Sequence, residues 1–357
     1  MAPTDDGATR LAELTTFRVG GPADRLVTAT TTDELVDAVR EVDDADEPLL
    51  VVAGGSNLLV TDEPIAGTVV RIATRGVTVE SADSCGGVNV RVAAGEPWDD
   101  LVARAVAEGW VGIEALSGIP GSVGATPVQN VGAYGQEVAQ TIASVRVWDR
   151  FGQQVVTVAS ADCRFTYRHS AFKGTDRFVV LDVLFQLRLG DLSAPVGYAD
   201  LARGLGVEVG ARVPLAEARE AVLAQRRRRG MVLDADDHDT WSAGSFFTNP
   251  ILSPGRFEAL RERVHDVLGP DVDPPAFPGG EGVKTSAAWL IERAGFTKGY
   301  GLPGPAALST KHTLALTNRG GASASDLVAL AREVRDGVRD RFGVTLVNEP
   351  VLVGLSL

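Results

Sequence analysis

The segment Gly112–Glu137, GIEALSGIPGSVGATPVQNVGAYGQE, contains six glycines and no charged side chain between Glu114 and Glu137. Pro120 and Pro127 exclude a long helix, and the alternation of apolar and polar residues that marks a strand is absent. Solvated linkers are usually charged or serine-rich, so we expect an ordered loop. Glycine lets backbone N–H groups approach a ligand closely, and rows of such donors bind phosphate. The segment is therefore either a ligand cradle or a glycine-rich turn cluster packed on the core.

The overall composition is that of a globular protein of two or three domains. Of the 357 residues, 45% are hydrophobic and 23% are charged. The net charge of −13 argues against nucleic acid as a partner, and the one basic run, Arg226–Arg229, is typical of a solvated helix end. No run approaches the ~18 to 20 apolar residues of a membrane span. The N-terminus lacks a secretory signal, and Cys85 and Cys163 form no CxxC motif, so we expect a cytoplasmic protein without metal or structural disulfide.

The first third of the chain alternates predicted strands and helices. We expect strands at 24–29, 49–53 and 69–72, and a helix after the capping box of Thr31 and Glu34. The second of these strands runs into Gly54–Gly55–Ser56–Asn57. This turn is a second candidate backbone cradle, although a plain turn explains it equally well.

The rest of the chain reads as a mostly antiparallel sheet followed by helices. We expect strands at 77–79, 88–92, 145–148, 155–158 and 178–189, and a helix from Pro97 to about Gly109. Beyond residue 215 the pattern predicts helices at 216–229, 254–268, 286–294 and 324–342. Apolar runs at 313–316 and 344–346 flank the last helix, which suggests a βαβ unit.

The common nucleotide-binding motifs are absent. Gly118, Gly121 and Gly124 are spaced by threes, which is not the GxGxxG of a dinucleotide-binding turn. No glycine precedes Lys284 as a P-loop requires, and the turn after residue 53 is not GxSxG. Nucleotide binding would therefore use another scaffold.

Three polar clusters could carry chemistry. Arg168, within Tyr167–Ser170, could grip a carboxylate through its planar guanidinium, or form a surface ion pair. Ser245, between a glycine and two phenylalanines, could donate a proton or cap a turn. Glu349 lies in an apolar C-terminal segment, where a carboxylate is costly to bury unless it is paired or functional, or where it blocks aggregation of an edge strand.

Together these clusters make the chain resemble the UDP-N-acetylenolpyruvoylglucosamine reductases, flavoenzymes that complete UDP-N-acetylmuramate for peptidoglycan. The resemblance runs nearly end to end. It rests on seven motifs in order: Thr15–Asp24 (TTFRVGGPAD), Ala53–Val60 (AGGSNLLV), Gly112–Glu137, Tyr167–Lys173 (YRHSAFK), Gly244–Pro250 (GSFFTNP), Ala287–Gly299 (AAWLIERAGFTKG) and Asn348–Gly354 (NEPVLVG).

The resemblance implies an α+β fold. We expect a two-subdomain FAD-binding fold of the vanillyl-alcohol-oxidase/PCMH type plus a C-terminal α/β substrate domain. Subdomain 1 would cover residues 1–75 with the C-terminal strand 344–357, subdomain 2 residues 76–212, and the substrate domain 213–343. The implied cofactor is non-covalent FAD, with NADPH as co-substrate and UDP-N-acetylenolpyruvoylglucosamine as substrate. We expect a monomer without membrane or nucleic-acid partners, serving cell shape and division.

The resemblance also implies a mechanism. NADPH reduces the flavin, flavin N5 delivers hydride to C3 of the enol ether, and C2 is then protonated. Ser245 matches the proton donor, and Arg168 and Glu349 match the pair that polarises the substrate carboxylate. Donors are needed there because hydride addition builds negative charge on the carboxylate. A dry site could keep Glu349 protonated, so that it can donate.

Further residues are assigned by the same resemblance. Those expected to hold FAD are Ala53, Gly54, Gly55, Ser56, Asn57, Leu58, Ser117, Ile119, Pro120, Gly121, Ser122, Gly124, Ala125, Gln129, Asn130 and Gly135. Those expected to contact the nucleotide-sugar are Tyr167, Tyr198, Arg229, Asn249 and Lys284.

The chain departs from the family pattern in two places. Some relatives have a lysine and a shorter loop where this chain has Arg226–Trp241, whose acidic insert contains Asp234, Asp236, Asp237 and Asp239. An arginine that some members carry after Glu349 is replaced here by Val351–Val353. Two rival functions are an oxidase of the same superfold, some of which bind flavin covalently, and a non-catalytic nucleotide-sugar sensor.

Overall fold

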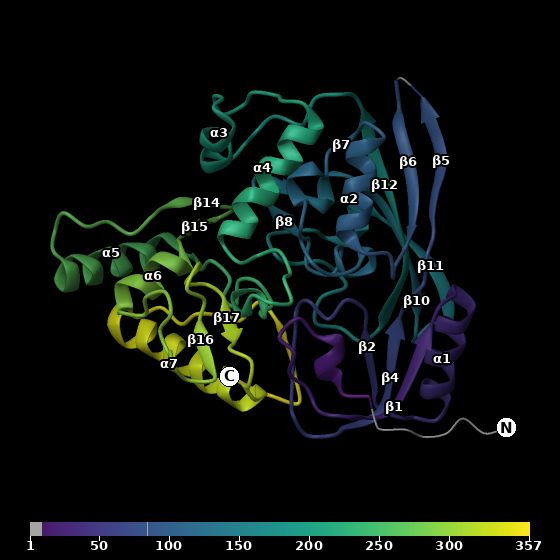
Figure 1. The fold of residues 1–357 in the computed structure, drawn as a ribbon, viewed down its shortest axis with the longest axis horizontal. Helices are drawn as coiled ribbons and strands as arrows, with labels where there is room; N and C mark the ends of the chain where they lie inside the picture. The colour runs from purple at the N-terminus through teal and green to yellow at the C-terminus, as the bar shows by residue number, and fades with distance from the viewer. Residues whose placement is uncertain (1–8, 84) are drawn as a thin grey trace. The chain divides into compact units, whose positions relative to one another are not determined.

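The computed structural model describes residues 9–83 and 85–357, which form two compact units (Figure 1). Unit 1 contains Ala23–Gly55 and Ile65–Val232, and unit 2 contains Arg10–Pro22, Ser56–Pro64 and Leu233–Leu357. The chain thus crosses between the units several times, and each unit is described by itself. The finer three-part division expected from the sequence stays a prediction.

A small parallel sheet begins unit 1. Strands β1 (Ala23–Ala29) and β2 (Leu49–Val52) both pair in parallel with β4 (Ile65–Ile72), in the order β1-β4-β2. Helix α1 (Thr32–Asp44) connects β1 to β2 and begins with the predicted capping box, in which the side chains of Thr31 and Glu34 satisfy each other's backbone N–H groups.

An antiparallel sheet forms the centre of unit 1, as the sequence predicts. Its strands follow the order β11-β10-β12-β6-β5, and the short β7 pairs with β12. Their bounds are β5 (Val77–Asp83), β6 (Gly87–Ala93), β7 (Trp110–Val111), β10 (Ile142–Asp149), β11 (Gln154–Ala159) and β12 (Phe178–Leu189).

Three helices complete unit 1. Helix α2 (Trp98–Ala107) starts one residue later than predicted, because Pro97 is the extended N-cap residue. Helices α3 (Ala199–Leu205) and α4 (Leu215–Arg228) follow β12. The glycine-rich segment lies between α2 and β10 and contains only short 3₁₀ turns and the two-residue strands β8 (Gly132–Ala133) and β9 (Gln136–Glu137), so it is the ordered loop that its sequence predicts.

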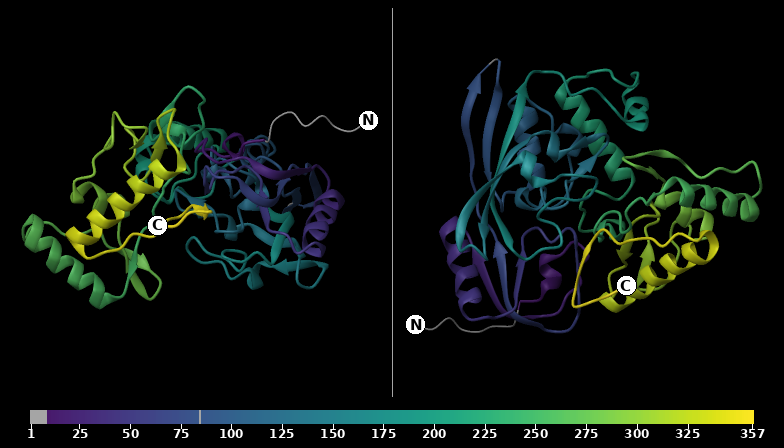
Figure 2. Two further views of the ribbon diagram at one scale, coloured as in Figure 1. Left: turned by 90° about the horizontal axis from the view of Figure 1, so that it is seen from below. Right: turned by 180° about the vertical axis from the view of Figure 1, so that it is seen from behind.

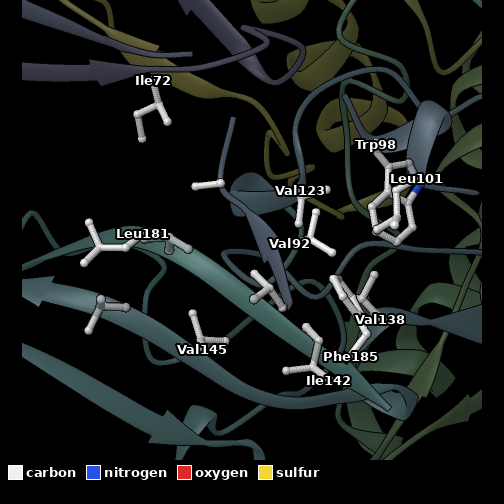
Figure 3. Close-up of a cluster of buried hydrophobic side chains, with 14 of the residues drawn as sticks. Ile72, Val92, Trp98, Leu101, Val123, Val138, Ile142, Val145, Leu181 and Phe185 are labelled. Atoms are coloured by element: carbon white, nitrogen blue, oxygen red, sulfur yellow. The ribbon is translucent and has the colours of Figure 1, made fainter. Parts of the chain in front are cut away.

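The core of unit 1 anchors this loop (Figure 3). Trp98 of α2 is fully buried, lies 6.0 Å from Phe185 between ring centroids, and donates its indole N–H to the carbonyl of Leu116 at 3.0 Å. Val123, in the middle of the glycine-rich segment, is also fully buried. Apolar side chains within the loop therefore fix a backbone that is otherwise rich in glycine.

Unit 2 is built on three helices: α5 (Pro254–Leu268), α6 (Ala287–Ala294) and α7 (Ala324–Phe342). Helix α7 packs against both α5 and α6, and Figure 2 shows it running beside them. Each helix begins with a serine that accepts a hydrogen bond from a backbone N–H of the first turn, which satisfies one of the donors left unpaired at a helix start.

The strands of unit 2 are short and differ from the prediction. Strand β3 (Leu58–Val60) pairs in parallel with the last strand, β18 (Val351–Val353). The others are β13 (Ile251–Leu252), β14 (Phe277–Gly279), β15 (Gly282–Lys284), β16 (Ala306–Leu308) and β17 (Leu316–Asn318).

The predicted βαβ unit around α7 is wrong. Within the described residues, strands β16 and β17 pair only with each other and are antiparallel, and residues 344–346 form no strand. Val344 and Leu346 are nevertheless buried in the core of unit 2. Their alternating pattern signals burial of every second side chain, and burial does not require a neighbouring strand.

None of the helices in the described part of the chain has the length and apolar character needed to cross a membrane.

Candidate active site

The glycine-rich segment is held in unit 1 mainly through its backbone. Gly121 accepts a hydrogen bond from the N–H of Trp98 at 3.0 Å, and the N–H groups of Val123 and Gly124 donate to the carbonyls of Glu96 and Ala94, both at 2.8 Å. These bonds bring residues 121–124 against the turn that precedes α2.

The two predicted cradles meet in unit 1 at glycine positions. A Cβ at Gly54 would lie 2.6 Å from the Cα of Gly121, and one at Gly124 would lie 2.5 Å from the Cβ of Ala94. Neither distance tolerates a side chain, so the close approach itself requires glycine. The turn after β2 and residues 121–124 therefore form one continuous backbone surface, the glycine surface.

Ser122 carries a buried hydroxyl at this surface. The residue is only 4% exposed, and its Oγ has no hydrogen-bond partner in residues 9–83 and 85–357. Ser117 and Thr126, also buried, donate their hydroxyls to the carbonyls of Glu114 and Val123. An unsatisfied buried hydroxyl costs about 1–3 kcal/mol, so Ser122 fits a ligand that offers an acceptor, such as a phosphate oxygen.

The remaining residues expected at the cofactor differ in what they can offer. The Asn130 amide donates to Glu137 at 2.8 Å and to the carbonyl of Thr166 at 3.1 Å, and its oxygen accepts from Ala139 at 3.1 Å. Asn130 therefore braces the loop from inside. Ala53, Ile119, Pro120 and Gln129 are half-buried, Gly55 is buried, Ala125 is exposed, and Gly135 has a φ of +86° at the tip between β8 (Gly132–Ala133) and β9 (Gln136–Glu137).

Arg168 lies in a tight turn that is joined to the same loop. Its guanidinium donates to the carbonyl of Gly132 at 2.9 Å and lies 5.3 Å from the ring centroid of Tyr167. Ser170 donates its hydroxyl to the carbonyl of Val128 at 2.6 Å. Hydrogen bonds within unit 1 therefore connect the turn that carries Arg168, the predicted carboxylate-binding residue, to the predicted cofactor-binding loop.

Tyr198 and Arg229 also lie in unit 1. Tyr198 is partly exposed and makes an edge contact with Tyr134, with 5.6 Å between ring centroids. Arg229 pairs with Asp200 at 3.2 Å.

Arg226 is a candidate that the sequence reasoning missed. The interpretation of the basic run as a solvated helix end holds for Arg227 and Arg228, which are exposed, but is wrong for Arg226. Its Nε is buried beside Gly118 and has no hydrogen-bond partner in the described residues, and burial lowers the pKa of Arg226 to about 10. The signal was the helical spacing, which places Arg226 four residues after the buried Val222.

Ser245 and Glu349 lie on paired segments of unit 2. The backbone N–H of Glu349 donates to the carbonyl of Phe246 at 2.8 Å, and Phe247 and Asn348 form an antiparallel bridge. Two clusters that are far apart in the sequence therefore form one structure, in which buried Phe246 and Phe247 fix the segment that carries half-buried Ser245.

The second half of the Gly54–Asn57 turn belongs to unit 2 and joins this structure. The side chain of Asn57 donates to the carbonyl of Glu349 at 3.4 Å, and the N–H of Val351 donates to the carbonyl of Asn57 at 2.9 Å. Ser56 and Leu58 are both half-buried. Leu58 is the first residue of β3 and pairs with Val351. The second half of the predicted turn therefore holds the backbone on both sides of Pro350.

Asn249 and Lys284 lie at the start of α6. The Asn249 side-chain oxygen accepts the N–H of Ala287 at 3.0 Å, which orients its amide group. Lys284 ends β15 and is paired with Ile251 and Phe277 on its two neighbouring strands.

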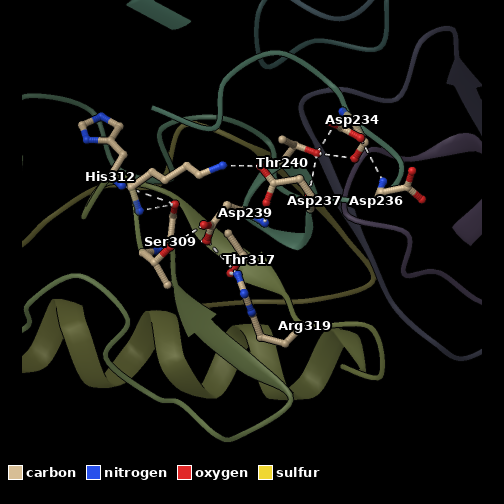
Figure 4. Close-up of polar contacts among 11 residues, drawn as sticks. Asp234, Asp236, Asp237, Asp239, Thr240, Ser309, His312, Thr317 and Arg319 are labelled. Atoms are coloured by element: carbon tan, nitrogen blue, oxygen red, sulfur yellow. Dashed lines mark hydrogen bonds and ion pairs between the residues drawn. The ribbon is translucent and has the colours of Figure 1, made fainter. Parts of the chain in front are cut away.

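Aspartates of the acidic insert form hydrogen bonds and ion pairs with other residues of unit 2 (Figure 4). Asp239 is buried and accepts hydrogen bonds from the backbone and hydroxyl of Thr310 and, at 2.7 Å, from Arg319. Burial opposes ionisation of Asp239, but these bonds outweigh it and lower its pKa. Asp237 pairs with Lys311. The insert thus fastens residues 234–240 to the turn between β16 and β17.

Comparison with known proteins identifies the family to which the chain belongs. Residues 23–157 match the family model of an FAD binding domain, and residues 236–353 match that of the C-terminal domain of UDP-N-acetylenolpyruvoylglucosamine reductase. The chain is 61% identical over 350 residues to the UDP-N-acetylenolpyruvoylglucosamine reductase of Streptomyces avermitilis, covering 97% of this chain and 94% of that one. It is 59% identical over 348 residues to that of Thermobifida fusca, covering 97% of each.

A solved structure agrees. The crystal structure of UDP-N-acetylenolpyruvylglucosamine reductase from Thermus caldophilus superposes with a TM-score of 0.64 at 26% identity, covering 97% of this chain and 98% of that one. The predicted fold class, an FAD-binding fold with a C-terminal substrate domain, is confirmed. The chain belongs to the UDP-N-acetylenolpyruvoylglucosamine reductase family.

Proposed function

We propose that this protein uses non-covalent FAD and NADPH to reduce UDP-N-acetylenolpyruvoylglucosamine to UDP-N-acetylmuramate, a step of peptidoglycan precursor synthesis. The observation that carries the proposal is the pairing of the Ser245 segment with the Glu349 segment through Phe246. The hydroxyl and the carboxyl group that the proposed reaction would use are therefore carried by two segments that pair with each other in unit 2.

The residues at the glycine surface fit the diphosphate of FAD. At Gly54 and Gly121 no Cβ atom covers the backbone. The buried Ser122 hydroxyl, which has no hydrogen-bond partner in the described residues, could donate to a phosphate oxygen. A cradle of neutral donors suits a diphosphate that already carries its charge. Bound FAD would supply the hydride that passes from NADPH to C3 of the enolpyruvyl group.

Arg168, Ser245 and Glu349 would handle the negative charge and the proton. Arg168 is held by its bond to Gly132, which leaves a planar, always charged group to face the substrate carboxylate. Glu349 would act at the same carboxylate, and the Ser245 hydroxyl would donate the proton to C2. Preorganised donors at such a site are often the largest contribution to catalysis.

In unit 2, we propose Asn249 and Lys284 as contacts with the nucleotide-sugar. Asn249 presents an amide that is already oriented by Ala287, and Lys284, which pairs with Ile251 on the neighbouring strand, would provide a cation. From unit 1 we propose Tyr167, Tyr198 and Arg229 as contacts.

The proposal is tested by the colour and the two half-reactions of the purified protein. The preparation should be yellow, NADPH should bleach the flavin band under anaerobic conditions, and the enolpyruvyl substrate should restore it. A colourless protein that fails to take up FAD would overturn the proposal. An oxidase would instead be reoxidised by oxygen and not by the enolpyruvyl substrate.

Ser245→Ala isolates the proton donor. We expect bleaching by NADPH to be unchanged and reoxidation by substrate to slow by about 10² to 10⁴-fold, the usual cost of losing a general acid. Equal slowing of both half-reactions would argue against the role. We also propose a monomeric cytoplasmic enzyme that supports cell shape and division, and sedimentation would test the oligomeric state.

A further inference from the structure

The motif Thr15–Asp24 contains none of the residues proposed to bind the cofactor or the substrate. In the structure, its first residues belong to unit 2 and lie against residues 241–247, the segment that carries Ser245. Their contacts to this segment are of three kinds: hydrogen bonds, a cation–aromatic stack and aromatic packing.

Hydrogen bonds join the motif to the residues just before Ser245. The hydroxyl of Thr16, itself buried, donates to the carbonyl of Ser242 at 2.6 Å. Asn318 donates its side-chain amide to the carbonyl of Phe17 at 2.9 Å and its backbone N–H to the carbonyl of Trp241 at 3.0 Å. Asn318 therefore bridges the motif and the serine segment.

Three side chains, those of Arg18, Trp241 and His238, also pack together at the start of the segment that carries Ser245. The guanidinium carbon of Arg18 lies 3.9 Å from the ring centroid of Trp241, and the ring of His238 packs edge-on at 4.4 Å. Arg18 has a φ of +55°, a conformation that residues with a side chain rarely adopt. Such strain persists only where the surrounding structure enforces it, so the placement of Arg18 over Trp241 is specific.

Aromatic packing holds the other side of Ser245. Phe17 is fully buried and meets Phe246 edge-on with 6.3 Å between centroids, and Phe246 meets Phe247 at 5.1 Å. The carbonyl of Phe246 is also the acceptor for Glu349. The motif therefore contacts residues on both sides of Ser245: Trp241 and Ser242 before it, and Phe246 after it.

We infer that Thr16, Phe17 and Arg18 are positioning residues that hold the Ser245 hydroxyl where it can transfer its proton. The inference deepens the proposed function and rests on it. A displacement of about 1 Å at a reacting group can cost about 10²-fold in rate, so a loose segment slows proton transfer without affecting steps that do not use Ser245.

The first test compares Arg18→Gln with a matched control, Arg341→Gln, which removes an exposed arginine stacked on Phe342 elsewhere in unit 2. We expect Arg18→Gln to slow reoxidation by the enolpyruvyl substrate about tenfold or more and to raise its solvent deuterium isotope effect, with bleaching by NADPH unchanged. Arg18→Lys, which keeps a cation over Trp241, should recover part of the rate. Arg341→Gln should change neither half-reaction.

The second test does not depend on catalysis. Hydrogen–deuterium exchange of the amides of Phe246 and Glu349 should become faster in Arg18→Gln and unchanged in Arg341→Gln. Thr16→Val, which removes the donor to Ser242 with little change in volume, should act in the same direction as Arg18→Gln and serves if Arg18→Gln does not fold.

The outcomes separate the two proposals. If the wild-type protein fails to reduce the substrate, the proposed function is wrong, while the exchange data still report on the contacts between Thr16–Arg18 and the segment that carries Ser245. Unchanged exchange in both Arg18→Gln and Thr16→Val, or equal slowing of both half-reactions, would overturn the positioning role.

Discussion

The backbone N–H of Glu349 donates to the carbonyl oxygen of Phe246 at 2.8 Å, and this single bond ties the C-terminal motif to the residue that follows Ser245. The antiparallel bridge between Phe247 and Asn348 continues the pairing. This pairing holds the backbones of Ser245 and Glu349, the proposed proton donor and its proposed carboxyl partner, on neighbouring segments.

Removing the Ser122 hydroxyl should affect cofactor binding and stability in opposite directions. Ser122→Ala deletes a buried group without a hydrogen-bond partner in the described residues, so the FAD-free protein should keep or slightly raise its free energy of unfolding. FAD affinity should fall about tenfold, the effect of losing roughly 1.4 kcal/mol. Urea unfolding of the FAD-free protein and a fluorescence titration with FAD measure the two effects.

Thr126→Val is the matched control for this prediction. Its hydroxyl donates to the carbonyl of Val123 at 2.8 Å, so its loss should lower stability by about 1 kcal/mol. If Ser122→Ala behaves like Thr126→Val and binds FAD normally, the hydroxyl does not serve the cofactor. A charge at the same place, Ser122→Asp, should expel FAD while the protein stays folded.

A methyl group at Gly54 should separate the two halves of the glycine surface. A Cβ there would lie 2.6 Å from the Cα of Gly121, so Gly54→Ala should push the backbones apart and weaken FAD binding about tenfold or more. Gly255→Ala, where the Cβ meets no atom of residues 9–83 and 85–357 within 4 Å outside its own helix backbone and chain neighbours, should leave FAD affinity unchanged. Normal FAD affinity in Gly54→Ala would show that the cofactor does not need this close approach.

Asn249 should contribute to stability and to substrate binding through different atoms. Asn249→Ala loses the acceptor for Ala287 and should cost about 1 kcal/mol of stability as well as raising KM. Asn249→Asp keeps an acceptor at the start of α6, so it should retain the stability, yet its negative charge should repel a diphosphate and raise KM at least as much. If Asn249→Asp binds the nucleotide-sugar normally, the residue acts only as a cap.

Acid should weaken unit 1 through Asp149. Its carboxylate accepts two bonds from Arg177, at 2.8 and 2.6 Å, which lower the pKa of Asp149 to about 2. The ionised form is favoured in the fold, so its contribution is complete above the unfolded pKa of about 4 and is lost as the pH falls from about 4 to about 2. Thermal unfolding of wild type and Asp149→Asn should differ by a constant amount above pH 5.

That difference should shrink across the acid range. Asp44→Asn, at an exposed position of α1, provides the control and should track wild type at every pH. A gap between wild type and Asp149→Asn that persists below pH 2 would mean that the two differ for a reason other than ionisation.

The sequence by itself determined the secondary structure where local chemistry decides it. The capping box at Thr31 and Glu34 and the helices α5 and α7 occur where the pattern predicts them, because caps and apolar periodicity act over a few residues. The family motifs likewise named Ser245 and Glu349. The runs at 313–316 and 344–346 led to the wrong prediction of a βαβ unit. Alternating apolar residues indicate burial, but they do not indicate which strand, if any, lies alongside.

Only the tertiary structure decided which of these residues act together. Residues distant in the sequence meet because backbone groups must pair and apolar side chains must pack, and no local pattern records such partners. The pairing of Phe246 with Glu349, the contact of Gly54 with Gly121 and the burial of the Arg226 Nε are of this kind. So is the stack of Arg18 on Trp241, which turns an N-terminal motif without visible chemistry into a support for Ser245.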